Sequence, residues 1–168
     1  MEALVCGIDP GLGVTGYAVV QTRGGRLRVV DAGVCCLVKG LPLAERLAQI
    51  DLDVSSVLAE HRPDVVAIEE LYAHYRHPRT AILMGHARGV IILAATRLRI
   101  EVRSYAATQV KRYLTGNGRA TKLQVQRAAQ TTLGLPVLPE PEDMADALAI
   151  AACCAGDVSS TSLAELSR

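Results

Sequence analysis

Hydrophobic residues in the first forty positions recur in short runs that are typical of β-strands. The first run ends in an Asp-Pro-Gly turn sequence, and two more runs follow closely. The connections between them are too short for a crossover, so these strands are expected to form an antiparallel meander. The three predicted strands cover Leu4–Asp9, Val14–Val20 and Leu27–Val38.

The period of the pattern changes after residue 42. Between Leu43 and His61, apolar residues recur every three or four positions with charged residues between them, which predicts an amphipathic helix. Strands and helices then alternate, beginning with Val65–Ile68, an apolar run typical of a buried central strand. The remaining elements are expected at about 78–97 (helix), 100–105 (strand), 107–114 (helix), 121–134 (helix with a Thr-x-x-Gln capping box) and 142–155 (helix).

A meander followed by alternating strands and helices predicts an α/β fold, in which helices flank a mixed sheet. The chain has 168 residues, which favours one domain. We expect this domain to span residues 1–155 and to be followed by a frayed C-terminal tail over 156–168, where serine is frequent.

The near-neutral net charge of +1 conceals a strong asymmetry. Between Tyr72 and Arg127 there are eleven Lys and Arg residues against one acid, Glu101, so this segment carries +10 and the rest of the chain −9. Such a division suits a protein in which one surface meets phosphates while another gathers carboxylates. A weaker interpretation, that the basic residues only solvate helix faces, stays open at this point.

The cysteines and the N-terminus bear on location. No apolar run approaches the ~18 residues of a membrane span, and the first residues contain no basic segment typical of a secretory signal. The odd number of cysteines and their apolar surroundings predict buried, reduced thiols in a cytoplasmic protein. The five are Cys6, Cys35, Cys36, Cys153 and Cys154.

Four acids stand where acids need an explanation. Asp9 ends the first strand, Glu69 ends the predicted central strand, and Asp143 and Asp146 share one face of an otherwise apolar helix. Each has a plain structural explanation: a turn former, a solvated strand end, or anions at a helix N-terminus. Glu70 would point to the opposite side of the pleat from Glu69.

If these four carboxylates converge, their mutual repulsion requires a cation. A donor set made only of oxygens suits Mg²⁺ or Mn²⁺ rather than zinc. Two such ions about 3.5–4 Å apart form the arrangement that hydrolyses phosphodiesters. The basic segment would then hold the flanking nucleic-acid backbone.

The order of several short motifs resembles that of RuvC-type Holliday junction resolvases. The opening Ile-Asp-Pro-Gly is shared with other folds, but the ordered set is specific. The matching stretches are Gly7–Gly11, Thr15–Ala18, Ala67–Glu69, Gly85–Val90, Tyr105 with Gln109–Lys111, Lys122 with Gln124–Gln126, and Asp143–Ala151.

The resemblance implies an RNase H-like fold with a five-stranded mixed sheet, working as a homodimer in the cytoplasm, on the nucleoid when bound to DNA. It implies metal-dependent cleavage of two opposed strands of a four-way DNA junction, which leaves 5′-phosphate nicks, and cooperation with a branch-migration complex of the RuvA–RuvB type. Two ions per site would be held by the catalytic acids Asp9, Glu69, Asp143 and Asp146. The DNA contacts would be Lys111, Lys122, the aromatic Tyr72 and Arg76 in the neighbouring loop.

Some alternatives stay open from the sequence. Glu70 replaces an amide common in the family, and the loop 73–78 is unusual. Other functions that fit part of the pattern are an actin-like phosphotransferase, a non-catalytic junction-binding protein and a related nuclease that acts on RNA. Ala81, Gly85 and Gly89 form a smooth stripe that either packs on the sheet or provides a two-fold dimer interface.

Overall fold

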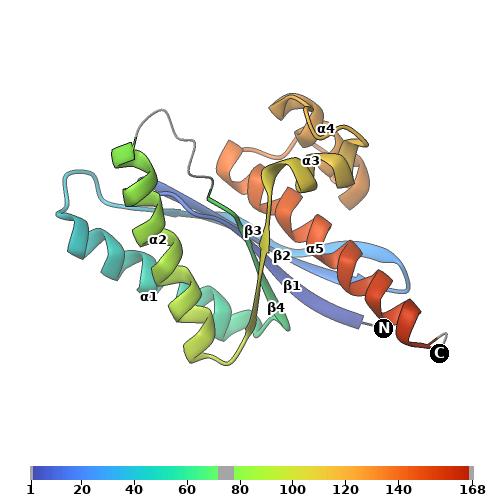
Figure 1. Ribbon diagram of the computed structural model, residues 1–168, viewed down its shortest axis with the longest axis horizontal. Helices are drawn as coiled ribbons and strands as arrows, with labels where there is room; N and C mark the ends of the chain where they lie inside the picture. The colour runs from blue at the N-terminus through green and yellow to red at the C-terminus, as the bar shows by residue number, and fades with distance from the viewer. Residues whose placement is uncertain (1, 72–77, 167–168) are drawn as a thin grey trace.

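The computed structural model describes residues 2–71 and 78–166 (Figure 1). One five-stranded sheet has the order β3-β2-β1-β4-β5, and its first three strands are antiparallel while β4 and β5 run parallel to β1. The mixed sheet predicted from the sequence is therefore confirmed. The elements are β1 (Glu2–Asp9), β2 (Val14–Arg23), β3 (Arg26–Cys36), α1 (Leu43–His61), β4 (Val65–Glu69), α2 (Pro78–Arg97), β5 (Glu101–Tyr105), α3 (Ala107–Thr115), α4 (Lys122–Leu133) and α5 (Glu142–Leu166).

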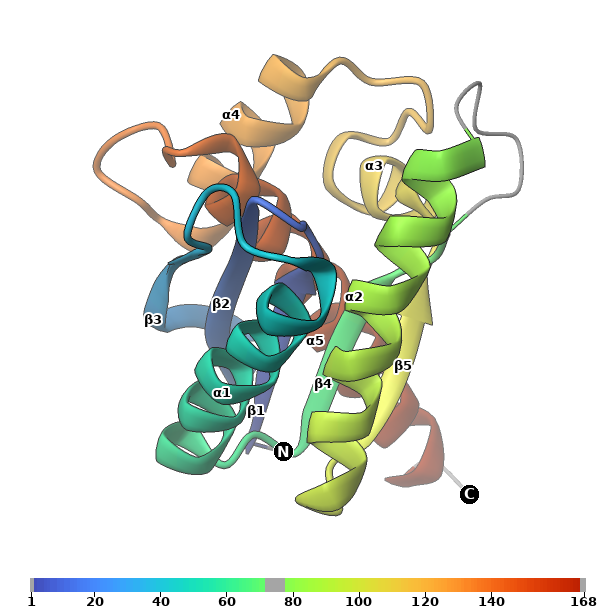
Figure 2. The same ribbon diagram turned by 90° about the vertical axis from the view of Figure 1, so that its left-hand side faces the viewer.

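Helices cover both faces of the sheet. Helices α1 and α2 lie side by side on one face, and α5 crosses the other face with α3 and α4 beyond it (Figures 1 and 2). The strands serve both layers because successive side chains alternate. In β1, Val5 belongs to the core under α5, whereas Cys6 and Ile8 belong to the core under α1 and α2.

Two glycines let α5 approach the sheet closely. A Cβ atom at Gly7 would lie 2.6 Å from the main-chain N of Ala151, and one at Gly16 would overlap the main-chain O of Asp143. Because backbone atoms in a packed helix cannot move aside cheaply, larger residues at these positions would push α5 away. The two glycines therefore set the depth at which α5 lies over β1 and β2.

The predicted end of the last helix was wrong. Helix α5 does not stop near Ala155 but continues to Leu166, so the expected tail is helical over most of its length. Val158 packs against the core, and Ser159 Oγ lies 3.0 Å from Thr22 Oγ1 on β2. Ser159 and Ser160 also donate hydrogen bonds to the carbonyls four residues earlier. The extent of the domain, 1–155, stays a prediction.

The prediction for the cysteines was right in part. All five are free, and Cys6, Cys153 and Cys154 are buried. Cys35 is half-buried and Cys36 is exposed, because both stand at the end of β3, an edge strand of the sheet. In the described part of the chain, no helix combines the length and apolar character needed to cross a bilayer.

Candidate active site

The parallel pairing of β1 and β4 brings two of the predicted acids to one edge of the sheet. Ile8 pairs with Ile68, so Asp9 and Glu69 are the next residues on two neighbouring strands. Both strands end there, at their carboxyl ends, where α/β sheets place ligand sites. The turn after Asp9 is held in place by Arg46 of α1, whose Nε donates to Leu12 O at 3.0 Å.

Helix α5 brings the other two acids to the same edge. Gly16 pairs with Asp9 in the β1–β2 ladder, and the absent side chain of Gly16 leaves room for the main chain of Asp143. The first two turns of α5 therefore lie beside Asp9. Asp143 and Asp146 are both partly buried there, although the helix is mainly apolar from Ala147 to Ala155.

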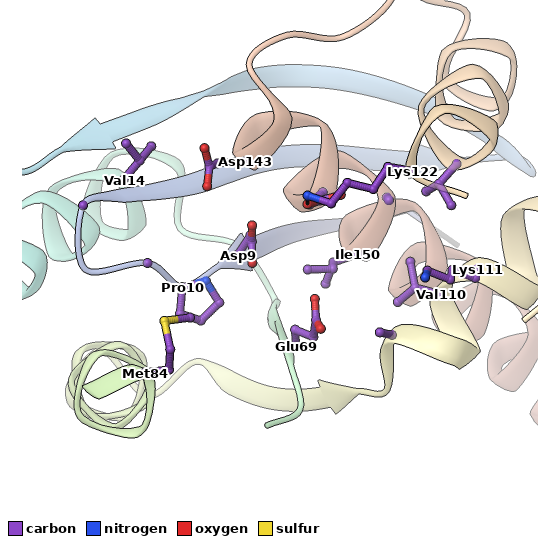
Figure 3. Close-up of a pocket in the computed structure, with 16 residues that line it drawn as sticks. Asp9, Pro10, Val14, Glu69, Met84, Val110, Lys111, Lys122, Asp143 and Ile150 are labelled. Atoms are coloured by element: carbon purple, nitrogen blue, oxygen red, sulfur yellow. Dashed lines mark hydrogen bonds and ion pairs between the residues drawn. The ribbon is translucent and has the colours of Figure 1, made fainter. Parts of the chain in front are cut away.

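All four acids line one cavity of about 590 Å³. Asp9 and Glu69 border the same space, and the side chains of Lys122 and Lys111 extend toward it (Figure 3). Lys111 comes from α3, and Lys122 is the first residue of α4, directly after the N-cap residue Thr121 and within the Thr121–Gln124 capping box. The full lining is Asp9, Pro10, Gly11, Gly13, Val14, Glu69, Met84, Ala107, Val110, Lys111, Lys122, Val125, Asp143, Asp146, Ala149 and Ile150.

Crowding and burial disturb the ionisation of these acids. Burial, together with the neighbouring carboxylates of Asp146, Glu69 and Asp143, raises the pKa of Asp9 from its ordinary value of 3.8 to about 7. Burial and the charge of Asp146 raise the pKa of Glu69, and burial raises the pKa of Asp146, although Lys122 opposes each shift. The site therefore holds more negative charge than its surroundings stabilise, which favours the binding of a cation.

Lys122 compensates part of that charge through two ion pairs. Its Nζ lies 3.0 Å from Glu142 Oε2 and 3.3 Å from Asp146 Oδ2. Glu142 was not predicted as a site residue. A sequence signal existed, because Glu142 stands four residues before Asp146 and so shares its helix face. Hydrogen bonding to Glu142 is the main reason why the pKa of Lys122 is raised.

The chemistry of the donors fits a hard divalent ion, but the side chains are not arranged as a closed ligand shell. Among the described residues, no three His, Cys, Asp or Glu side chains form a group that could hold one ion. The four carboxylates instead surround a common space. Their oxygens match Mg²⁺ or Mn²⁺ in type.

The structure describes two further residues that the sequence singled out, Lys111 and Glu70. Lys111 is half-buried in the cavity wall. Glu70 does not line the cavity, and its backbone N–H donates to Tyr105 O at 2.9 Å. Tyr72 and Arg76 lie outside the described residues.

The chain is similar in sequence to known proteins over most of its length. A family model described as crossover junction endodeoxyribonuclease RuvC matches residues 5–154. Curated relatives with this name are 51% identical over 149 residues (Rhodopirellula baltica; 89% of this chain and 84% of the relative) and 42% identical over 150 residues (Pelotomaculum thermopropionicum; 89% and 91%).

The folded chain is also similar to solved structures. A structure of T. thermophilus RuvC in complex with Holliday junction substrate matches with a TM-score of 0.89 and 36% identity, over 95% of this chain and 96% of that chain. The yeast mitochondrial Holliday junction resolvase, at 16% identity and a TM-score of 0.65 over 90% and 77% of the two chains, shows a shared fold alone. The fold is RNase H-like, as the resemblance implied, and the chain belongs to the RuvC family of crossover junction endodeoxyribonucleases.

Proposed function

We propose that this protein is an endonuclease that resolves four-way DNA junctions by metal-dependent hydrolysis of one phosphodiester in each of two opposed strands. The observation that carries the proposal is the set of four carboxylates, Asp9, Glu69, Asp143 and Asp146, around one cavity with two lysines. The T. thermophilus relative was solved with Holliday junction substrate, which supports the same substrate class here. The products would be nicks with 5′-phosphates.

The four acids are proposed as the catalytic residues and as the ligands of two Mg²⁺ or Mn²⁺ ions. When bound, such ions supply a water of lowered pKa and stabilise the charge on the leaving oxygen. The chain contributes the placement of the carboxylates. Asp9 and Glu69 are fixed by neighbouring strand ends, and Asp143 and Asp146 by a helix that is held against Gly16.

Lys122 has two roles in this proposal. Without DNA it neutralises Asp146 through the 3.3 Å ion pair. Its side chain is 62% exposed, so it can leave that pair and meet a DNA phosphate at the mouth of the cavity. Lys111 is less exposed than Lys122 and supplies positive charge near Glu69, where it opposes the rise in the pKa that burial causes. Tyr72 and Arg76 remain proposed DNA contacts at the junction centre.

The proposed active form is a homodimer built through α2. Gly85 and Gly89 are exposed on this helix, and no atom lies within 4 Å of a Cβ built at either position. These two glycines therefore do not pack against the sheet of their own chain. Ile82, 61% exposed, and Leu93, 47% exposed, add apolar surface to the same helix. A two-fold dimer would present two identical active sites, which would match the two-fold symmetry of a four-way junction.

We place the protein in the cytoplasm, on the nucleoid when it is bound to DNA. The three buried free thiols support a reducing compartment. A branch-migration complex of the RuvA–RuvB type is the proposed protein partner, on the strength of family membership.

The decisive experiment is incubation of an immobile synthetic four-way junction with the protein and each divalent metal in turn, with both nicks mapped at nucleotide resolution. Symmetric nicks with 5′-phosphates that require Mg²⁺ or Mn²⁺ are expected. A linear duplex serves as the control substrate, and a four-way RNA junction tests the alternative substrate. Binding without cleavage under every metal would favour a non-catalytic junction-binding protein and contradict the proposal.

A further inference from the structure

Arg88 connects α2 to two strand ends beside the cavity. Its Nε donates to the main-chain O of Glu69 at 3.0 Å, and its Nη2 donates to Ser104 Oγ at 2.6 Å. Glu69 is the last residue of β4, and Ser104 stands on β5 opposite Ile68. The guanidinium therefore spans two adjacent parallel strands at the edge where the acids lie.

The contact between Arg88 and Glu69 lies where the regular pairing of β4 with β5 ends. Pairing between β4 and β5 ends at Glu69 and Tyr105, with one further bond from Glu70 N–H to Tyr105 O. Beyond that point the chain leaves the sheet, so regular strand pairing no longer fixes the backbone. Arg88 supplies a rigid, forked side-chain donor at this boundary, which a lysine could not match with its single ammonium group.

The contact acts on geometry rather than on charge. Arg88 binds the carbonyl of Glu69, not its carboxylate, and Lys111 and Lys122 are the cations that oppose the burial-driven rise in the pKa of that carboxyl. A bond to this carbonyl restrains the peptide plane after Glu69, and so restrains the end of β4 from which the Glu69 side chain leaves the backbone. Functional groups need placement within about 0.5 Å to act together.

We propose that Arg88 is a positioning residue for Glu69: it holds the end of β4 against β5 so that the Glu69 carboxylate points into the cavity. This inference rests on the proposed function, in which Glu69 is an acid of the nuclease site. It assigns to α2 a second role besides the proposed dimer contact, since one face of the helix is exposed and Arg88 reaches the strand ends.

The test compares Arg88→Met, Arg88→Lys and Ser104→Ala with a matched control, Arg97→Met. Arg97 is also on α2, but its ion pair is with Asp51 on an exposed surface. Two measurements use the junction: the single-turnover rate of its cleavage and its Kd. The third is the affinity of the DNA-free protein for Mn²⁺, obtained from the electron paramagnetic resonance signal of the unbound ion. For Arg88→Met we expect a rate about 10²-fold lower, Mn²⁺ binding about tenfold weaker and an unchanged junction Kd.

Arg88→Lys should lie between Arg88→Met and the wild type, because one ammonium can restore the bond to the Glu69 carbonyl. Ser104→Ala should lower the rate by a smaller factor, and Arg97→Met should match the wild type in all three measurements. Ser104→Ala and Arg88→Lys carry the test if Arg88→Met does not fold.

Wild-type rates and Mn²⁺ binding in Arg88→Met would overturn the inference. A rate that falls only in proportion to the unfolded fraction, with unchanged Mn²⁺ binding, would also overturn it, because the role would then be structural alone. If the wild type itself cleaves no junction, the proposed function fails, but Mn²⁺ binding to the variants still decides whether Arg88 positions Glu69.

Discussion

Asp9 bears much of the electrostatic cost of gathering four carboxylates. Its pKa of about 7 means that the folded protein retains a proton that the unfolded chain releases near pH 4. The folded state thus binds more protons between these values, so the free energy of unfolding falls as pH rises through this window. At about 1.4 kcal/mol per pKa unit, the full effect is of the order of 4 kcal/mol.

This cost gives the first prediction. In metal-free buffer, Asp9→Asn should remove most of the loss of stability between pH 4 and pH 7, and should be more stable than the wild type at pH 8. Urea unfolding at a series of pH values measures the free energy of unfolding of each protein. Asp51→Asn, which alters an acid outside the cavity, should retain the wild-type slope. Parallel pH profiles for Asp9→Asn and the wild type would contradict the assignment.

The same substitution has a second consequence, for activity. Asp9→Asn and Asp146→Asn should each abolish junction cleavage, because each removes an oxygen donor of the cation site. Junction binding should be retained or tightened, since a charge that repels phosphate is lost. A cleavage assay and a gel-shift titration on the same junction separate the two effects. Residual cleavage close to the wild-type rate would show that these acids are dispensable.

Lys122 yields a third prediction. Lys122→Ala should weaken junction binding and should reduce the slope of log K against log salt by about 0.9, the value for one phosphate contact on duplex DNA. Binding titrations at several salt concentrations measure it. Lys39→Ala, which changes an exposed lysine away from the cavity lining, is the control. An unchanged slope for Lys122→Ala would mean that Lys122 serves only to neutralise Asp146 and Glu142.

Among the helices and strands, features that depend only on neighbouring residues could be predicted from the sequence. The capping box at Thr121 and Gln124 is present with both of its hydrogen bonds. The end of α5 was not predictable in this way, because Ser159 and Ser160 are weak helix formers whose contacts with Thr22 and with the preceding turn are visible only in three dimensions.

The candidate site shows the same division. Strand ends and helix spacing were sufficient to select four acids that share one cavity. The ion pairs of Lys122 with Glu142 and Asp146, and the bond from Arg88 to the Glu69 carbonyl, join different elements across 19 to 24 residues of chain. Helical spacing places Glu142 on the face of Asp146, but periodicity within one element does not say which residue of another element it contacts, so the pairing with Lys122 and the Arg88 bond emerged only from the folded chain.

The packing of α5 on β2 leads to a prediction at this scale. Gly16→Ala would place a methyl group into the main chain of Asp143, which should displace the first turn of α5 and destabilise the fold by about 3 kcal/mol. Gly13→Ala, in the adjoining turn, is the control because no atom lies within 4 Å of its Cβ. Chemical denaturation measures both. Equal stability of the two variants would mean that α5 does not need this close approach.

At the scale of the whole molecule, the acids and the lysines line one cavity at the end of the sheet. Gly85 and Gly89 are exposed on α2, which lies beside α1 in one helical layer (Figure 2). The cavity and this surface are separate, yet α2 also contributes Met84 to the cavity lining and Arg88 to the strand ends. A partner bound to α2 would therefore contact a helix that supports the site.

The proposed dimer can be tested on this surface. Gly89→Glu should leave the isolated fold as stable as before or more stable, because the position is open and glutamate favours a helix more than glycine by up to about 1 kcal/mol. In a close helix–helix contact the same side chain would clash with its symmetry mate and repel it. Sedimentation should therefore show monomers for Gly89→Glu and dimers for the wild type and for Thr132→Glu, an exposed position on α4. Paired nicking should be lost with the dimer, and a dimeric Gly89→Glu variant would move the interface to another face.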